Sequence, residues 1–183
     1  LRPEGMAARR HRYFDFLMPG FIGMGVMTYS VIGMASVISL YRQQKIFKRI
    51  LATPLRVRDF FIPQILAYLV LSLVQAAIIM AAGVALFNAT IYGNLGYMFL
   101  LVLLGNIIFL NLGFIVGSFS STVEAASGLG NVVTMPMMFF SGVFFPTDTL
   151  PNVLEAGVKY LPLTPMLEAL RGVLLDANPP WEY

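Results

Sequence analysis

Residues 60–87 read FFIPQILAYLVLSLVQAAIIMAAGVALF, a stretch without a single Asp, Glu, Lys, Arg or His. A helix needs about 20 predominantly apolar residues to cross the hydrocarbon core of a bilayer, and its backbone must satisfy its own hydrogen bonds there. The stretch exceeds that length. It therefore predicts a transmembrane helix, and this prediction decides the fold class.

Three further stretches share the lack of ionisable residues: 16–40, 96–118 and 125–145. Charged residues make up only 11% of the chain, whereas soluble domains contain about 25%. The first stretch is too long for the apolar core of a signal peptide, and no small-residue cleavage pattern follows it. The sequence thus predicts an all-α integral membrane protein, a polytopic helical bundle with four spans.

Basic residues gather in the loop between the first two predicted spans, residues 41–59. Against the single acid Asp59, this loop holds Arg42, Lys45, Lys48, Arg49, Arg56 and Arg58. Short loops rich in Lys and Arg face the cytoplasm, so we place the loop there, although four arginines precede the first span. Residues 88–95, which carry no charge, then lie outside, and residues 119–124 form a second cytoplasmic turn.

The chain divides into three regions on this basis. We expect residues 1–15 to be the end of an outer domain or a juxtamembrane segment, residues 16–145 to be the transmembrane domain, and residues 146–183 to hold two short helices. Apolar residues recur at helical spacing in both short helices, but neither is long enough to cross the membrane. We expect them to be interfacial or re-entrant half-helices on the outer side.

A short amphipathic helix is predicted inside the cytoplasmic loop. Its apolar face holds Ile46, Phe47, Ile50 and Leu51, and its polar positions hold Lys45, Lys48 and Arg49. Such a helix can dock into a groove on a soluble partner. It can equally lie in the membrane surface, with its basic residues against anionic headgroups. The spacing alone leaves both interpretations open.

Several polar or small residues lie within the predicted spans. A polar stripe on the second span consists of Gln64, Tyr68, Ser72 and Gln75, and single amides follow at Asn106 and Asn131. These residues either line a substrate pathway or form interhelical hydrogen bonds, which contribute on average about 0.6 kcal/mol. Gly113 and Gly117 form a GxxxG pair, a pattern that permits close helix approach in a dimer or within one chain.

The sequence contains no motif of a catalytic or nucleotide-binding site. A GxxxxGK[ST] loop is absent, so the chain does not bind ATP by a P-loop. His11 is the single histidine and there is no cysteine, so we expect no metal site. We therefore expect no enzymatic activity and no cofactor in this chain. The partner we expect from composition is the lipid bilayer, not a nucleic acid.

Spans without a carboxylate or histidine also argue against a proton-coupled carrier, which usually needs one. Three classes of function remain open from the residues alone. The chain is part of a transporter whose energy enters through another subunit, a passive channel or carrier, or a membrane-anchored assembly or sensor protein.

Four segments together carry a resemblance to a known family. They are YFDFLMPG at 13–20, FKRILATPL at 47–55, SGVFFP at 141–146 and LPLTP at 161–165. In this order and spacing they resemble the ATP-binding-cassette (ABC) type 2 permeases over essentially the whole chain. This family includes exporters of drugs, lipids and polysaccharides.

The resemblance implies a permease subunit of six spans in the cell (inner) membrane, of which this sequence lacks the first span, much of an outer domain and the last span. It also implies dimerisation with a second copy or a paralogue, and a separate ATPase subunit that holds ATP and Mg²⁺. The loop helix would then be the coupling helix, and the ATPase contact would consist of Lys45, Phe47, Lys48, Arg49, Ile50 and Leu51. The stretch FFSGVFFP looks most like the drug-export branch, so the implied substrate is hydrophobic or amphipathic.

Overall fold

The computed structural model consists of six α-helices, without any strand in the residues that it describes, which are 3–51, 57–87, 94–143, 158 and 160–175. Up to residue 16, and at several helix ends, the description covers the backbone only. The helices are α1 (Pro3–Gln43), α2 (Ile46–Leu51), α3 (Val57–Phe87), α4 (Leu95–Phe119), α5 (Val123–Phe140) and α7 (Leu163–Leu175). The predicted all-α class is confirmed.

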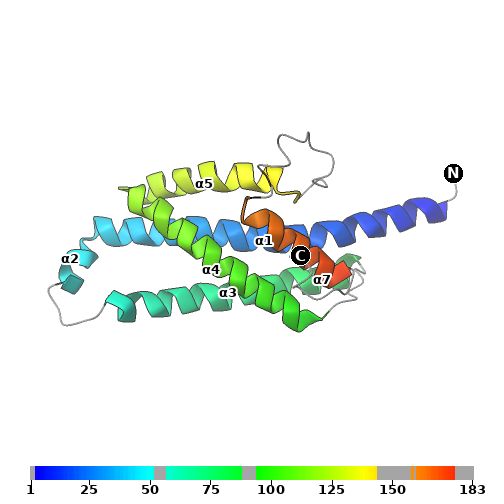
Figure 1. Ribbon diagram of the computed structural model, residues 1–183, viewed down its shortest axis with the longest axis horizontal. Helices are drawn as coiled ribbons and strands as arrows, with labels where there is room; N and C mark the ends of the chain where they lie inside the picture. The colour runs from blue at the N-terminus through cyan, green and yellow to red at the C-terminus, as the bar shows by residue number, and fades with distance from the viewer. Residues whose placement is uncertain (1–2, 52–56, 88–93, 144–157, 159, 176–183) are drawn as a thin grey trace.

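α1 is the central helix of the bundle, because it contacts each of the other five. α3 and α5 lie along opposite sides of α1, and α4 crosses it (Figure 1). We call the end of the bundle that carries α2 and the α4–α5 turn the loop end. The described parts of the first predicted cytoplasmic segment, 41–51 and 57–59, thus lie at the same end as residues 119–124, and the first turns of α1 extend beyond the opposite end (Figure 1).

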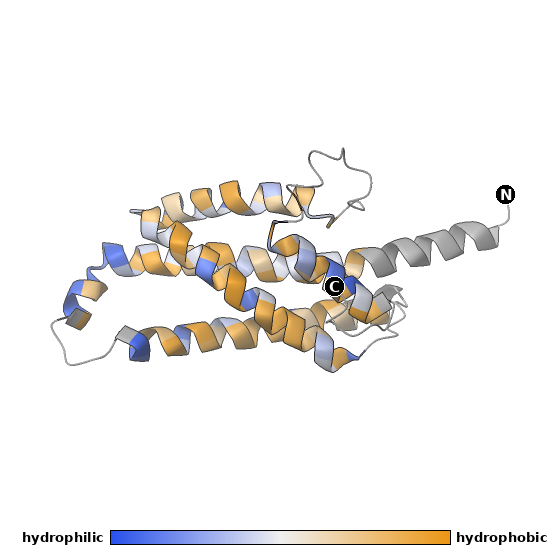
Figure 2. Ribbon diagram, in the orientation of Figure 1, coloured by the Kyte–Doolittle hydropathy of each residue, from blue (hydrophilic) through white to orange (hydrophobic). Residues whose placement is uncertain are grey.

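Within the part of the chain that the structure describes, three helices are long and apolar enough to cross a membrane. The candidate spans are Leu17–Gln43 of α1, Arg58–Ala85 of α3 and Leu95–Phe119 of α4. Hydrophobic residues cover most of α3 and α4, whereas hydrophilic residues gather on α2 and on the adjoining ends of α1 and α3 (Figure 2). This distribution fits helices that run through a bilayer and end at its polar surface.

The predicted fourth span at 125–145 corresponds to α5, which is shorter than expected. It has 18 residues and ends at Phe140, and Gly142 follows with a φ of 80°. The apolar run continues to Phe145 in the sequence, but a glycine with positive φ just beyond the last turn commonly stops a helix. α5 is also less apolar than the three candidate spans, since it contains Glu124, Asn131 and Pro136.

Side-chain caps define where α4 and α5 begin. The Asn94 carboxamide oxygen accepts a hydrogen bond from the Gly96 N–H at 2.8 Å, and the Thr122 hydroxyl accepts one from the Ala125 N–H at 3.1 Å. Both bonds satisfy donors that the first turn of a helix leaves free. The cap at Thr122 allows α5 to follow α4 after a tight turn.

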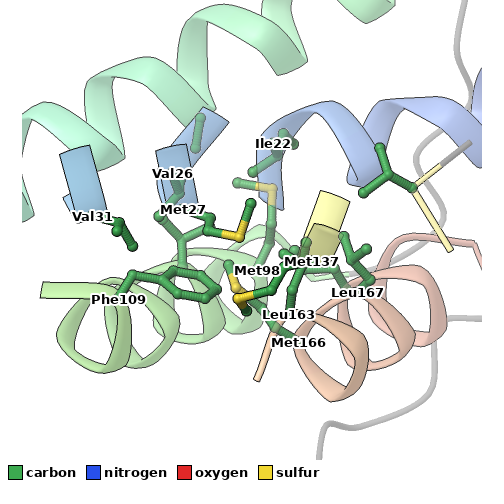
Figure 3. Packing of buried hydrophobic residues seen from close by; sticks show 14 of the residues in the cluster. Ile22, Val26, Met27, Val31, Met98, Phe109, Met137, Leu163, Met166 and Leu167 are labelled. Atoms are coloured by element: carbon green, nitrogen blue, oxygen red, sulfur yellow. The ribbon is translucent and has the colours of Figure 1, made fainter. Parts of the chain in front are cut away.

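The main core forms where α1, α4, α5 and α7 meet (Figure 3). Its labelled members are Ile22, Val26, Met27 and Val31 of α1, Met98 and Phe109 of α4, Met137 of α5, and Leu163, Met166 and Leu167 of α7. The second predicted half-helix is therefore present as α7, and its apolar face is packed inside the bundle. The first predicted half-helix lies almost entirely outside the described residues.

The GxxxG pair brings α4 close to α1 within the chain. A Cβ atom added at Gly113 would lie 2.7 Å from the Val31 carbonyl oxygen, and one at Gly117 would lie 2.8 Å from the Ile38 Cβ and 2.9 Å from the Ala35 carbonyl oxygen. Real Cβ atoms do not come so close to backbone, so the two helices can approach only because both positions are glycine. The pair thus serves packing between α1 and α4 within the chain, and the dimer role considered from the sequence stays a prediction.

Gly113→Ala should destabilise the protein, because its methyl group would meet backbone atoms that cannot move aside. Overpacking of this kind costs about 1–3 kcal/mol. Gly128→Ala is the matched control, since nothing lies within 4 Å of the added atom there. Thermal unfolding in detergent should show a lower midpoint for Gly113→Ala only. Equal midpoints for the two variants would contradict the close approach of α1 and α4.

Candidate functional site

A sharp bend joins α1 to α2 at the loop end. Lys45 has a φ of 55°, the single positive φ of a non-glycine residue in the described part of the chain. The Lys45 N–H donates to the Arg42 carbonyl at 3.0 Å, and the Arg49 N–H donates to the Lys45 carbonyl at 3.3 Å. Left-handed backbone is uncommon for residues other than glycine. The chain therefore reverses here in a defined, hydrogen-bonded turn.

α2 has two faces with different surroundings. Phe47 is partly buried and Ile50 is buried against the bundle, whereas Lys45, Lys48 and Arg49 are exposed. Of Leu51 only the helical backbone is described. The five expected ATPase contacts whose side chains are described therefore divide into an exposed basic face, Lys45, Lys48 and Arg49, and an apolar face, Phe47 and Ile50, that packs on the chain itself.

Phe47 belongs to a cluster of aromatic rings that joins four helices. Its ring centroid lies 6.2 Å from that of Tyr41 in α1 and 6.1 Å from that of Phe61 in α3. Phe61 lies 5.7 Å from Phe114 of α4, and Phe60 lies 4.9 Å from Tyr41. Separations of this size are typical of stabilising ring pairs. Sequence reasoning missed Phe60, Phe61 and Phe114, although an aromatic pair directly after the basic loop was a visible signal.

Arg42 links the two turns of the loop end. Its guanidinium Nη1 donates to the Ser120 carbonyl at 3.1 Å, and Ser120 is buried at the end of α4. Positive charge near the carboxyl end of a helix is favourable, because the last carbonyl groups carry partial negative charge. By contrast, Arg58 and Asp59 form an ion pair of 3.5 Å with largely exposed side chains, an arrangement that contributes little.

Three residues of the polar stripe on α3, namely Gln64, Tyr68 and Ser72, take part in hydrogen bonds within the bundle. The Tyr41 hydroxyl donates to the Gln64 Oε1 at 3.4 Å. The Asn106 Nδ2 of α4 donates to the Tyr68 carbonyl at 3.2 Å, and both residues are buried. Ser72 is also buried and donates to the Leu69 carbonyl of its own helix at 2.8 Å. Gln64, Tyr68 and Asn106 thus take part in hydrogen bonds between helices, whereas the bond of Ser72 lies within α3.

Gln75 differs from the rest of the stripe, because it borders a groove between α1 and α3. The groove has a volume of about 450 Å³, and Gln75 is the single polar side chain in its lining. The lining consists of Leu17, Met18, Phe21, Met24, Gly25, Gln75, Ile78, Ile79, Ala82 and Gly83. The Gln75 amide fits here because Gly25 has no side chain: an added Cβ would lie 2.0 Å from the Gln75 Nε2.

Asn131 lies on a different kind of surface. It is exposed on α5, beside Val132 and Met135, whose exposed fractions are 69% and 56%. The amide of Asn106, in contrast, is buried in the bundle. The two amides that the sequence treats alike are therefore separated by the structure, and Asn131 is the one that an external molecule can reach.

The described residues contain no cluster of acidic, histidine or cysteine side chains that could hold a metal ion. The charged groups that the structure does place together are the basic residues at the loop end. The site thus consists of a basic surface on α2 and an apolar groove with one amide between α1 and α3, and both are surfaces that suit binding.

Comparison with characterised proteins identifies relatives of this chain. It is 26% identical over 168 residues to ABC transporter G family member 20 of Dictyostelium discoideum, covering 90% of this chain and 22% of that protein. It is 24% identical over 164 residues to nodulation protein J of Rhizobium leguminosarum bv. trifolii, covering 89% and 62%. It is 25% identical over 144 residues to the probable multidrug ABC transporter permease YbhR of Escherichia coli K12, covering 78% and 39%.

The chain thus spans between 22% and 62% of the length of these three relatives. No solved structure matches it significantly. Residues 4–175 match the ABC-2 type transporter family, whose permeases pair with ATPase subunits in membrane transporters. Because this match covers nearly the whole chain, the protein belongs to the ABC-2 type transporter family and is a multi-pass membrane permease domain without ATPase activity of its own.

Proposed function

We propose that this chain is the permease subunit of an ATP-driven exporter of the cell (inner) membrane, and that α2 is the coupling helix on which the ATPase subunit docks. The observation that carries the proposal is the division of α2 into a packed apolar face and an exposed basic face. Lys45, Lys48 and Arg49 would contact the ATPase, while Phe47 and Ile50 hold the helix to the bundle. A basic docking face calls for an acidic groove on the partner.

α5 is the part of the bundle that we expect a second permease copy or a paralogue to cover. Its 18 residues are about 27 Å long at 1.5 Å per residue, close to the thickness of the hydrocarbon core. It can therefore act as a fourth span. Its exposed face combines Asn131 with Gly128, and an amide facing lipid would lack hydrogen-bond partners. A partner helix or a polar pathway beside α5 removes that cost.

We infer the substrate class from the groove between α1 and α3 and from the exposed face of α5. An apolar groove with one amide, Gln75, suits hydrophobic or amphipathic molecules with few polar groups. The exposed amide of Asn131 offers a second polar contact on the face that a partner would cover. The name of the E. coli relative, a probable multidrug permease, favours drug-like molecules over other lipid-soluble compounds.

Charge reversal on α2 should break the link to the ATPase. The double variant Lys48→Glu with Arg49→Glu places like charges against an acidic groove, so the ATPase subunit should no longer co-purify in mild detergent and ATP-dependent transport should be lost. The protein should still insert into the membrane, because both side chains are exposed. Pull-down of the ATPase with the tagged permease measures the effect.

The matched control is Lys48→Arg with Arg49→Lys, which exchanges the side chains and keeps the charge. It should retain the ATPase. If the Glu variant retains the ATPase as well as the control does, α2 is not the dock. If the unaltered protein binds no ATPase, the passive carrier or the membrane-anchored assembly or sensor protein becomes the better interpretation.

Substitution of Asn131 and of Asn106 should distinguish a side chain in the substrate pathway from one that packs between helices. Asn131→Leu should change which compounds are transported while thermal stability stays the same, because the side chain is exposed. Asn106→Leu should leave the compound profile unchanged and shift the free energy of unfolding by less than about 1 kcal/mol, the scale of one interhelical hydrogen bond. Uptake assays with a panel of dyes in vesicles, alongside thermal unfolding, measure both. A changed compound profile in Asn106→Leu with an unchanged profile in Asn131→Leu would contradict the assignment of Asn131 to the pathway and of Asn106 to packing.

A further inference from the structure

We propose that Phe47 is the positioning residue through which movement of α2 reaches α3 and α4. The inference rests on the proposed function, since it assumes that an ATPase moves α2. It adds the route by which that movement enters the bundle. The route is the chain of ring contacts from Phe47 to Phe61 and from Phe61 to Phe114.

α2 cannot hold its position alone. It has six residues, and isolated helices of that length are unstable. Its backbone joins α1 through the left-handed turn at Lys45, which fixes one end. The side of α2 that faces the bundle is held by the buried Ile50 and by Phe47, whose ring contacts Tyr41 of α1 and Phe61 of α3. Without this ring, α2 would lose its ring contact with α3.

The hydrophobic cluster around Phe47 is separate from the main core. Its buried members are Met34, Ile38, Tyr68 and Leu110, and Phe47, Phe61 and Ile65 pack against them. These residues come from α1, α2, α3 and α4, whereas the main core is built largely from α1, α4, α5 and α7. Interiors of packed side chains transmit displacement because they are dense. A displacement of α2 is therefore passed through this cluster to α3 and α4, which share it with α1 and α2.

Two further bonds strengthen this unit. Tyr41 contacts Phe47 and Phe60 with its ring and donates its hydroxyl to Gln64, so that a ring contact and a hydrogen bond join α1 to α3 next to α2. Arg42 holds the Ser120 carbonyl at the end of α4. The cationic face of α2 remains free of these contacts and available to the ATPase.

The first test measures the distance between α2 and α3 in the permease without its ATPase. The chain has no native cysteine, so spin labels attach only at Lys48→Cys on α2 and Leu66→Cys on α3, both exposed. Dilution with unlabelled protein restricts the signal to pairs within one chain. We expect a narrow distance distribution for the parent protein, a broad one after Phe47→Ala, and a narrow one after Phe47→Tyr, which keeps the ring. Phe119→Ala is the control, since Phe119 is 81% exposed at the same end of the bundle.

The second test measures, in the complex with the ATPase, whether movement of α2 is transmitted to α3. Labels at Leu66→Cys on α3 and Val132→Cys on α5, both exposed, report whether α3 moves relative to α5 when the ATPase is trapped with ATP and vanadate. We expect a shift in the parent protein, loss of the shift in Phe47→Ala, and recovery in Phe47→Tyr. The ATPase should co-purify with all three, because the basic face of α2 is intact.

An unchanged shift in Phe47→Ala would overturn the inference, as would a distance distribution between α2 and α3 as narrow as in the parent. Loss of the shift in Phe119→Ala would also overturn it, because the effect would then not depend on the ring cluster. Failure of the parent protein to bind any ATPase would overturn the proposed function instead, while the spacing between α2 and α3 would still decide whether Phe47 positions α2.

Discussion

Apolar helices in a bilayer gain nothing from the hydrophobic effect when they pair, because lipid chains are as apolar as their side chains, so close contact has to hold them together. In this chain such a contact joins α4 to α1 at Gly113 and Gly117, where added Cβ atoms would meet the backbone of α1. α1 also contacts each of the other five helices that the structure describes. The ring cluster, to which α4 contributes Phe114, therefore depends on this pair.

This packing divides the polar side chains of the helices into two groups. Those that bond across helices near the loop end, such as Asn106 to Tyr68 and Tyr41 to Gln64, hold α3 against α1 and α4. Others face outward: Gln75 toward the groove, and Asn131 on α5. The first group explains how α3 stays attached although most of its surface is exposed, and the second marks where a substrate or a partner can make polar contact.

The sequence predicted what depends on local pattern. Charge-free runs identified α1, α3 and α4, and the spacing around Phe47 identified α2 as a short amphipathic helix. It failed where the outcome depends on long-range contact or on a single backbone angle. The end of α5 depends on the φ of Gly142, the burial of α7 depends on its fit against α1 and α4, and the partners of Phe47 lie far along the chain at Phe61 and Phe114. Hydrophobic periodicity shows that α2 has an apolar face that includes Phe47, but it does not show which helix this face contacts.

The claim that α2 is a cytoplasmic dock is tested most directly by the sidedness of the bundle. Lys48→Cys and Asn94→Cys place single cysteines at exposed positions in a chain that otherwise has none. Lys48 belongs to α2, and Asn94 is the N-cap of α4, which begins at the end of the bundle opposite α2 (Figure 1). A membrane-impermeant maleimide added to intact cells should label Asn94→Cys, and it should label Lys48→Cys only after the cells are permeabilised. Labelling of Lys48→Cys in intact cells would place α2 outside, beyond the reach of any ATPase, and would contradict the account.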